Sequence, residues 1–119
     1  MATYRAVFSD TVIAESDHTV VVDGYRYFPE AAVHREFLVD STHLSVCGWK
    51  GQASYYDVVV DGARADEAAW YYADPKSAAD MVRGHIGFWR GAKVERSRDA
   101  EGDAAPRSAM TRLSRRLAG

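Results

Sequence analysis

Two segments of the chain share one pattern, a run of valines that ends in Asp-Gly, and this pattern is typical of β-hairpins. The valine runs are residues 20–22, followed by Asp23-Gly24, and residues 58–60, followed by Asp61-Gly62. Asp-Gly supplies the positive φ angles that the tight turns of hairpins require, and β-branched residues favour strands. We therefore expect a hairpin at each Asp-Gly and a fold that is mainly β.

The remaining elements follow from alternation, proline and glycine. Alternating or β-favouring segments predict strands over 4–8, 12–15, 18–22, 25–28, 36–39, 54–60, 64–72, 85–89 and 93–96. Turns are expected at 9–11, 40–42 and 90–92, a helical turn at 29–33, a loop before residue 54 and a short helix over 76–83. The predicted fold is a compact, antiparallel, tent-like or barrel-like single domain with one or two short helices.

Size and charge limit what the chain can do. A chain of 119 residues with 47% hydrophobic and 27% charged residues fits one globular domain that needs no disulfide. We expect a β-rich domain over residues 1–96 and a polar linker with a basic tail over 97–119. The domain carries net charge −4 and the tail +2. Because nucleic-acid binding normally needs a basic stripe, we expect no nucleic-acid partner.

The same sequence predicts the compartment. No apolar run approaches the roughly 20 residues that cross a bilayer, so no membrane segment is expected. The N-terminal residues lack the pattern of a secretory signal, and the single cysteine cannot form an internal disulfide. We expect a cytoplasmic protein, either a monomer or a homodimer.

The segment Cys47-Gly48-Trp49-Lys50-Gly51 is the strongest candidate for a functional loop. Glycines on both sides allow the backbone to turn sharply, so that Lys50 points into a site while Trp49 folds back as a wall. The alternative is an ordinary tight turn with a buried tryptophan and a solvated lysine.

Reactive groups lie near this loop in the sequence. Lys50 is three residues from Cys47, and a nearby lysine lowers the pKa of a thiol. The catalytic candidates are therefore Cys47 and Lys50, with His43 or His85 as a base. A buried, inert Cys47 is the alternative. Ligand pairs at zinc spacing and the glycine-rich nucleotide-binding motifs are lacking, so we expect no metal and no cofactor.

Aromatic residues supply the walls of the expected ligand site. Eight of the fourteen aromatics lie between residues 49 and 89. The ligand-binding candidates are Trp49, Lys50, Tyr56, Trp70 and Tyr72, with Tyr56 and Tyr72 beside Lys50 in a cup for a planar or cationic ligand. The alternative is a core with tyrosine hydroxyls at its rim.

The loop and its surroundings resemble a bacterial family, the domain of unknown function 427. The resemblance is carried by Phe28-Pro29, Val33, Ser41-Thr42, Cys47-Gly48-Trp49-Lys50-Gly51, Ala53, Tyr55-Tyr56, Ala69-Trp70-Tyr71-Tyr72, Pro75 and Gly84-His85-Ile86-Gly87-Phe88. The family commonly has proline where this chain has Gly48. The resemblance implies a small β-rich domain and no particular reaction. A nucleotidyltransferase label is sometimes attached to the family, but this chain lacks the paired carboxylates and the Gly-Ser signature of such enzymes.

These observations predict a domain that binds a small molecule, including an anionic one, in an aromatic site around the Cys47–Gly51 loop. Two alternatives remain open. One is an enzyme, a transferase or hydrolase that uses Cys47 or Lys50, and the other is a protein-interaction module that uses the aromatic surface or the basic tail.

Overall fold

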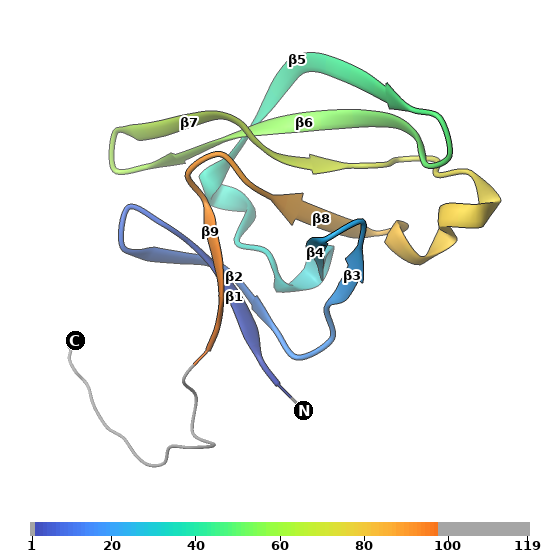
Figure 1. The fold of residues 1–119 in the computed structure, drawn as a ribbon. Helices are drawn as coiled ribbons and strands as arrows, with labels where there is room; N and C mark the ends of the chain where they lie inside the picture. The colour runs from blue at the N-terminus through green and yellow to red at the C-terminus, as the bar shows by residue number, and fades with distance from the viewer. Residues whose placement is uncertain (1, 98–119) are drawn as a thin grey trace.

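The structure, a computed structural model, describes residues 2–97, and within this range two antiparallel sheets make up the domain (Figure 1). The strands are β1 Tyr4–Phe8, β2 Thr11–Ser16, β3 Val20–Val22, β4 Tyr25–Pro29, β5 Leu38–Cys47, β6 Gly51–Val60, β7 Ala63–Tyr71, β8 His85–Phe88 and β9 Lys93–Arg96. Three short 3-10 helices are η1 Glu30–Ala32, η2 Arg35–Phe37 and η3 Ser77–Val82. The prediction of a mainly β, antiparallel domain is confirmed.

The strand order shows how the two sheets are built. The smaller sheet has the order β2-β1-β9, and the larger has the order β3-β4-β8-β7-β6-β5. Both sheets keep free edges, so they are open rather than closed into a barrel. The long β5–β6–β7 part of the larger sheet lies above the smaller sheet in Figure 1.

Both Asp-Gly turns have the backbone that the sequence predicts. The φ angles are 55° at Asp23 and 83° at Gly24, and 48° at Asp61 and 85° at Gly62. They join β3 to β4 and β6 to β7, as expected. Positive φ at both central residues matches the right-handed twist of the strands that the turn connects.

Buried side chains form two clusters on opposite sides of the larger sheet. The core cluster joins the two sheets and consists of Ala6, Ile13, Ala14, Phe28, Val33, Tyr56, Val58, Val60, Ala68, Ala69, Ile86, Phe88 and Ala92. The aromatic-face cluster consists of Val22, Tyr27, Ala53, Tyr55, Trp70, Tyr72, Ala79 and Val82, with Val20, Cys47 and Trp89 packed against it. The period of two along a strand places neighbours such as Tyr55 and Tyr56 in different clusters.

Four local predictions are wrong. The strand expected over 36–39 begins only at Leu38, because the preceding residues form η2. Residues 40–42 do not form a turn but belong to β5, where the register shifts between Asp40 and Leu44. The loop before residue 54 is shorter than expected, because β6 already begins at Gly51. Residues 76–83 contain the 3-10 helix η3, with a kink at Ala79, rather than a regular helix.

The end of the described chain is packed onto the domain. Ser97 is buried, and its backbone N–H donates to the carbonyl of Thr3 at 2.7 Å. The linker and basic tail that the sequence predicts lie, from residue 98 on, outside the described residues. Among residues 2–97, no helix has the length and apolar character that a membrane span requires.

Candidate functional site

The turn between β5 and β6 does not have the buried tryptophan and solvated lysine of the alternative interpretation. Lys50 is 6% exposed, whereas Trp49 is 39% exposed. Lys50 thus points inward, and Trp49 is the outer residue. Gly51 permits this turn with φ of 114°, and the Lys50 carbonyl accepts a hydrogen bond from the N–H of Lys76 at 2.9 Å. We call residues 47–51 the hairpin tip.

The buried ammonium of Lys50 is neutralised by a carboxylate from the β3–β4 turn. Its Nζ donates to Asp23 Oδ2 at 2.5 Å, and Trp49 Nε1 donates to the same oxygen at 3.2 Å. Nζ also lies 4.8 Å from the ring centre of Trp49 and 5.9 Å from that of Tyr72. The charge of Lys50 is therefore satisfied within the protein, as a buried charge must be.

This pairing moves the pKa values of both partners. The hydrogen bond from Lys50 lowers the pKa of Asp23, and this outweighs the opposing effect of burial. Burial by itself lowers the pKa of Lys50, but the hydrogen bond to Asp23 and the nearby groups of Tyr72, Tyr27 and Cys47 raise it above the ordinary value. Both shifts favour the ion pair.

Cys47 lies at the start of the hairpin tip with its thiol unpaired by disulfide. Burial raises the pKa of this thiol, but the backbone N–H groups of Trp49 and Lys50 and the charge of Lys50 lower it more, so the net pKa is below that of an ordinary cysteine. This environment favours the thiolate.

Next to the hairpin tip, aromatic rings cover one side of the larger sheet, which we call the aromatic face. Tyr25 meets Trp70 edge-on at 5.1 Å between ring centres and Trp89 at 5.8 Å, and the two tryptophans are 5.0 Å apart. Trp70 Nε1 donates to the hydroxyl of the buried Tyr27 at 3.2 Å. Gly87 makes room for this arrangement, because a Cβ atom there would lie 2.7 Å from Trp70 Cζ2.

The tyrosines of this face are held in the neutral form. Burial raises the pKa of Tyr72 to about 12. Burial also raises the pKa of Tyr27, although the Trp70 N–H that it accepts acts in the opposite direction. Both hydroxyls therefore stay protonated near neutral pH.

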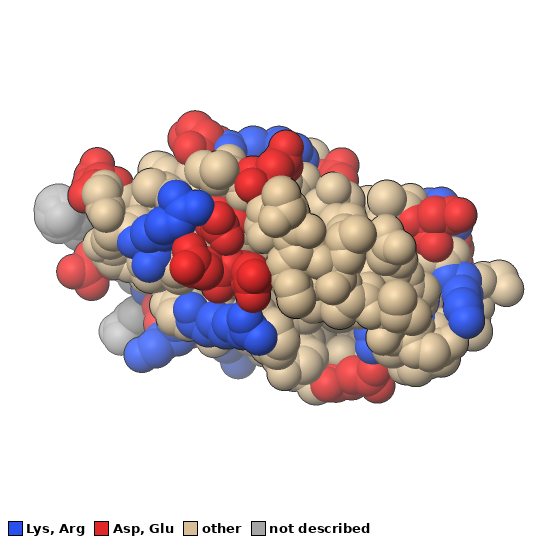
Figure 2. Space-filling model, turned by 90° about the horizontal axis from the view of Figure 1, so that it is seen from above, with Lys and Arg blue, Asp and Glu red and all other residues tan. Residues whose placement is uncertain are grey.

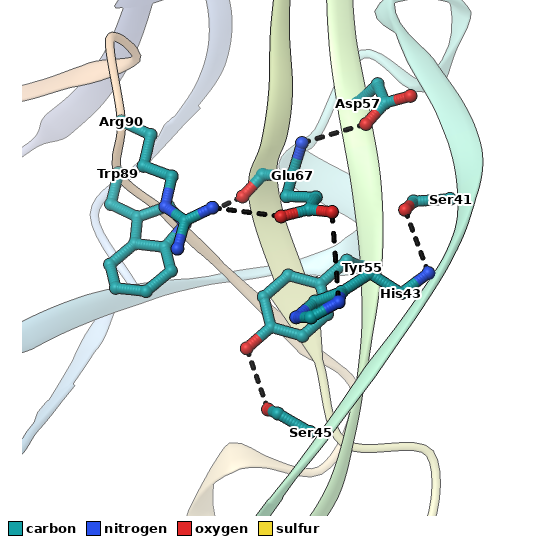
Figure 3. Close-up of polar contacts among 8 residues, drawn as sticks. All are labelled: Ser41, His43, Ser45, Tyr55, Asp57, Glu67, Trp89 and Arg90. Carbon is teal, nitrogen blue, oxygen red and sulfur yellow. Dashed lines mark hydrogen bonds and ion pairs between the residues drawn. The ribbon is translucent and has the colours of Figure 1, made fainter.

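A second polar group, the Glu67 bulge, lies at the other end of the aromatic face (Figure 3). Its members come from β5, β6, β7 and the residues after β8. They are His43, Ser45, Tyr55, Asp57, Glu67, Trp89 and Arg90. Asp57 is buried, accepts the N–H of Glu67 at 2.8 Å and forms an ion pair with Arg64. Sequence reasoning missed Glu67, Ser45, Tyr55 and Arg90, because no motif marks a bulge.

The structure separates the candidates that the sequence grouped together. Trp49, Trp70 and Tyr72 lie with Lys50 and Cys47 at or near the aromatic face. Tyr56 does not: it belongs to the core cluster, stacks on Tyr71 at 5.0 Å and accepts a hydrogen bond from Arg35. The expected cup of Tyr56 and Tyr72 beside Lys50 is therefore wrong, because neighbouring Tyr55 takes the face toward Lys50.

The two histidines proposed as bases also lie apart from Cys47. His43 contacts Tyr55 and Glu67, and His85 is hydrogen-bonded through Nδ1 to the Arg83 carbonyl at 2.8 Å. Residues 44–47 of β5 are paired regularly with β6, so Leu44 and Cys47 are about 10 Å apart along the strand. This separation disfavours direct proton transfer between Cys47 and His43.

One family profile matches the chain over residues 2–100, that of a domain of unknown function, DUF427, labelled NTP_transf_9. The chain belongs to the DUF427 family. No curated protein matches it. The matched range contains both the hairpin tip and the Glu67 bulge, so both are parts of the DUF427 domain itself.

Two hollows of this DUF427 domain lie away from the hairpin tip. One hollow of about 460 Å³ is lined by Arg5, Asp10 and Lys93 among others, and one of about 320 Å³ lies between the β3–β4 turn and β9. Neither is lined by Cys47 or Lys50. Within the described range, no three His, Cys, Asp or Glu side chains are arranged to hold a metal ion.

Proposed function

We propose that this DUF427 domain binds a small molecule on the aromatic face, between the hairpin tip and the Glu67 bulge. Aromatic surface with a few hydrogen-bonding groups is the usual composition of a ligand site. Tyr25 is 40% exposed, so the ring cluster that it forms with Trp70 and Trp89 reaches solvent.

The observation that carries this proposal is a pair of hydroxyl groups among the rings. Ser45 Oγ and the Tyr55 hydroxyl are 2.8 Å apart, and Tyr55 belongs to the same cluster as Trp70. Only one hydrogen is needed for the bond between them, so the other O–H is free to donate to a ligand. Aromatic rings supply contact area, and such polar groups supply orientation.

The hairpin tip defines how an anionic ligand would bind. Lys50 is already paired with Asp23, whose side chain is 51% exposed at the β3–β4 turn. An anionic group therefore binds by taking the place of the Asp23 carboxylate. Removal of that carboxylate is expected to increase the affinity for small anions, because it leaves a buried ammonium without a partner.

The test is a screen of nucleotides, sugar phosphates and small carboxylates by thermal shift and tryptophan fluorescence. All three tryptophans of the chain lie at the aromatic face or the hairpin tip, so a ligand there alters the emission. A bound ligand also raises the melting temperature by mass action. Parent, Lys50→Met, Asp23→Asn and the control Lys93→Met, on the other sheet, are compared. The proposal is overturned if every hit binds all four proteins equally.

A second candidate function, catalysis through Cys47, is favoured by the environment of its thiol. Backbone N–H groups and Lys50 lower the pKa of this thiol, as described above. We expect iodoacetamide to alkylate Cys47 at neutral pH faster than an ordinary cysteine, and Lys50→Met to slow this reaction. A rate equal to that of a free thiol in both proteins would argue against a nucleophilic role.

We also propose that the protein forms a homodimer through the edge strand β5. The free edge strand β5 exposes Leu44 (54%) and Val46 (77%), and Figure 2 shows a broad uncharged area beside the charged side chains of this surface. Such an edge favours pairing with a second copy, so a homodimer is preferred over a monomer. Val46→Lys should then shift the mass measured by light scattering to that of the monomer.

The lone cysteine and the acidic domain support a cytoplasmic protein without a nucleic-acid partner.

A further inference from the structure

Glu67 makes four polar contacts at the aromatic face. Its N–H donates to Asp57 at 2.8 Å, and its carbonyl accepts Trp89 Nε1 at 2.7 Å. Its carboxylate accepts Arg90 Nη1 at 2.9 Å and reaches His43 Nδ1 at 3.8 Å (Figure 3). Its φ angle is 56°, in the left-handed range that strains a residue with a side chain. Such strain persists only where surrounding contacts enforce it.

Two bulges, on the strands that flank β6, bring Glu67 and His43 together. Residues 66–68 of β7 lie opposite Asp57 alone, and residues 41–43 of β5 lie opposite Tyr55 alone. The extra residues in β5 and β7, the two strands paired with β6, thus direct the side chains of His43 and Glu67 toward each other across β6. Bulges often occur next to active sites, where they redirect side chains.

The contact with Glu67 orients the imidazole of His43. The carboxylate faces Nδ1, so the tautomer with hydrogen on Nδ1 is favoured and Nε2 is left as an acceptor. Within residues 2–97, no protein group forms a hydrogen bond or ion pair with Nε2. At 3.8 Å the contact is longer than a hydrogen bond, and catalytic contacts are often long before a ligand binds.

The surroundings of Nε2 suit a neutral molecule with a hydroxyl group. The His43 ring lies against Tyr55, 4.7 Å between ring centres, and the Ser45–Tyr55 hydroxyl pair lies on the same side of the sheet (Figure 3). The nearby charges pair with each other, Glu67 with Arg90 and Asp57 with Arg64. No excess positive charge attracts a polyanion to this end of the face.

We propose that His43 is the proton acceptor for a planar, hydroxyl-bearing ligand of the phenol class, bound on the aromatic face with Glu67 as the positioning residue. This inference rests on the proposed function. The ligand O–H bond breaks, its electron pair stays on oxygen, and the proton forms an N–H bond at Nε2. The imidazolium then faces Glu67, and the free O–H of the Ser45–Tyr55 pair donates to the new oxyanion.

The probe is 4-nitrophenol, whose anion is yellow, so that its absorbance reports the proton transfer directly. Calorimetry measures binding, and visible absorbance at one neutral pH measures the ionised fraction of bound probe. The parent is expected to increase this fraction over that of free probe. His43→Gln should abolish the increase and weaken binding roughly tenfold, the effect of a lost charge-assisted hydrogen bond.

Two further variants separate positioning from folding. Glu67→Gln keeps the shape of the side chain and should lower the ionised fraction several-fold while the melting temperature changes little. His85→Gln, which removes a half-buried histidine with no carboxylate contact, should leave binding and absorbance as in the parent.

The possible outcomes distinguish failure of the His43 role from failure of the proposed ligand binding. If the probe binds but is no more ionised in the parent than in His43→Gln, the proton-acceptor role is overturned while binding on the aromatic face stands. If the probe does not bind but members of the nucleotide, sugar phosphate or carboxylate screen do, the phenol class is overturned. If nothing binds in either assay, both proposals fail.

Discussion

The two buried clusters lie on opposite sides of one sheet and differ in what they bury. The core cluster contains aliphatic residues and phenylalanines, with Tyr56 as its only member that carries a polar side-chain atom. The aromatic-face cluster holds the Trp70 indole and three tyrosine hydroxyls beside the ion-paired Lys50. Buried polar atoms need defined partners, so they fix ring orientations as well as positions. From this difference we expect the core cluster to contribute most of the stability, whereas the aromatic face is the side on which we propose ligand binding.

The largest expected effect tests the core side of this comparison. Phe28 is fully buried and meets Phe88 edge-on at 5.7 Å. Phe28→Ala should lower the free energy of unfolding by about 3–5 kcal/mol, because it removes a large side chain and leaves a cavity. Val46→Ala, on the exposed strand edge, should change it by at most about 0.5 kcal/mol. Chemical denaturation measures both, and equal effects would show that the core cluster does not dominate stability.

A smaller loss of stability is expected at Gly87, where the backbone of β8 lies against the Trp70 ring of the aromatic face. The Cβ atom of Gly87→Ala collides with Trp70, so we expect a loss of about 1–3 kcal/mol and a shift of tryptophan emission. Gly48→Ala is the matched control, since nothing lies within 4 Å of its Cβ position and its φ is not in the left-handed range. An unchanged emission spectrum in Gly87→Ala would mean that Trp70 has room to move.

The third prediction separates stability from function at the Glu67 bulge. Glu67→Gly removes the strain of a positive φ but also the contacts to Arg90 and His43. These effects oppose each other, so the free energy of unfolding should stay within about 1 kcal/mol of the parent. Ionisation of bound 4-nitrophenol should nevertheless be lost. Gln52→Gly, in an ordinary part of β6, should cost about 0.5–1 kcal/mol. A loss in Glu67→Gly clearly larger than that of Gln52→Gly would indicate that the bulge stabilises the fold.

The sequence predicted the strands far better than the site. Valine runs and Asp-Gly turns located β3, β4, β6 and β7 because turn chemistry is local. Register shifts are not local: Asp40-Ser41-Thr42 has the composition of a turn, yet pairing with β6 holds it in β5. Glu67 could not be predicted for the same reason, because its contacts come from three other segments of the chain.

Lys50 shows a second limit of sequence reasoning. A lysine between two glycines fits either a lysine that points into a site or an exposed turn, and the sequence contains no sign that Asp23, on another hairpin, pairs with it. Its burial follows from tertiary contacts with Tyr72 and Asp23, not from its own neighbours. Tyr55 and Tyr56 illustrate the same point. The alternating pattern of a strand predicts that they lie on opposite faces of the sheet, but not which of the two belongs to the core cluster.

The smallest expected effect is the pH dependence of stability from the Asp23–Lys50 pair at the hairpin tip, because the Asp23 side chain is half exposed and solvent screens its charge. The pKa of Asp23 is lowered in the folded state, so its contribution to stability is present above its ordinary value of 3.8 and is lost as pH falls through the lower folded value. The pKa of Lys50 is raised, so its contribution is present below 10.5 and is lost as pH rises through the higher folded value. Between these limits the pair contributes fully.

Asp23→Asn therefore should be less stable than the parent between pH 3.8 and 10.5, and the difference should shrink below 3.8. Denaturation of the parent, both single variants and the Asp23→Asn, Lys50→Met double variant at pH values inside and outside this window measures the coupling between the two residues. Other carboxylates titrate in the same range, but they are common to all four proteins and cancel in the cycle. A coupling that persists unchanged below pH 3.8 would show that packing of the two turns, rather than the ion pair, joins the hairpins.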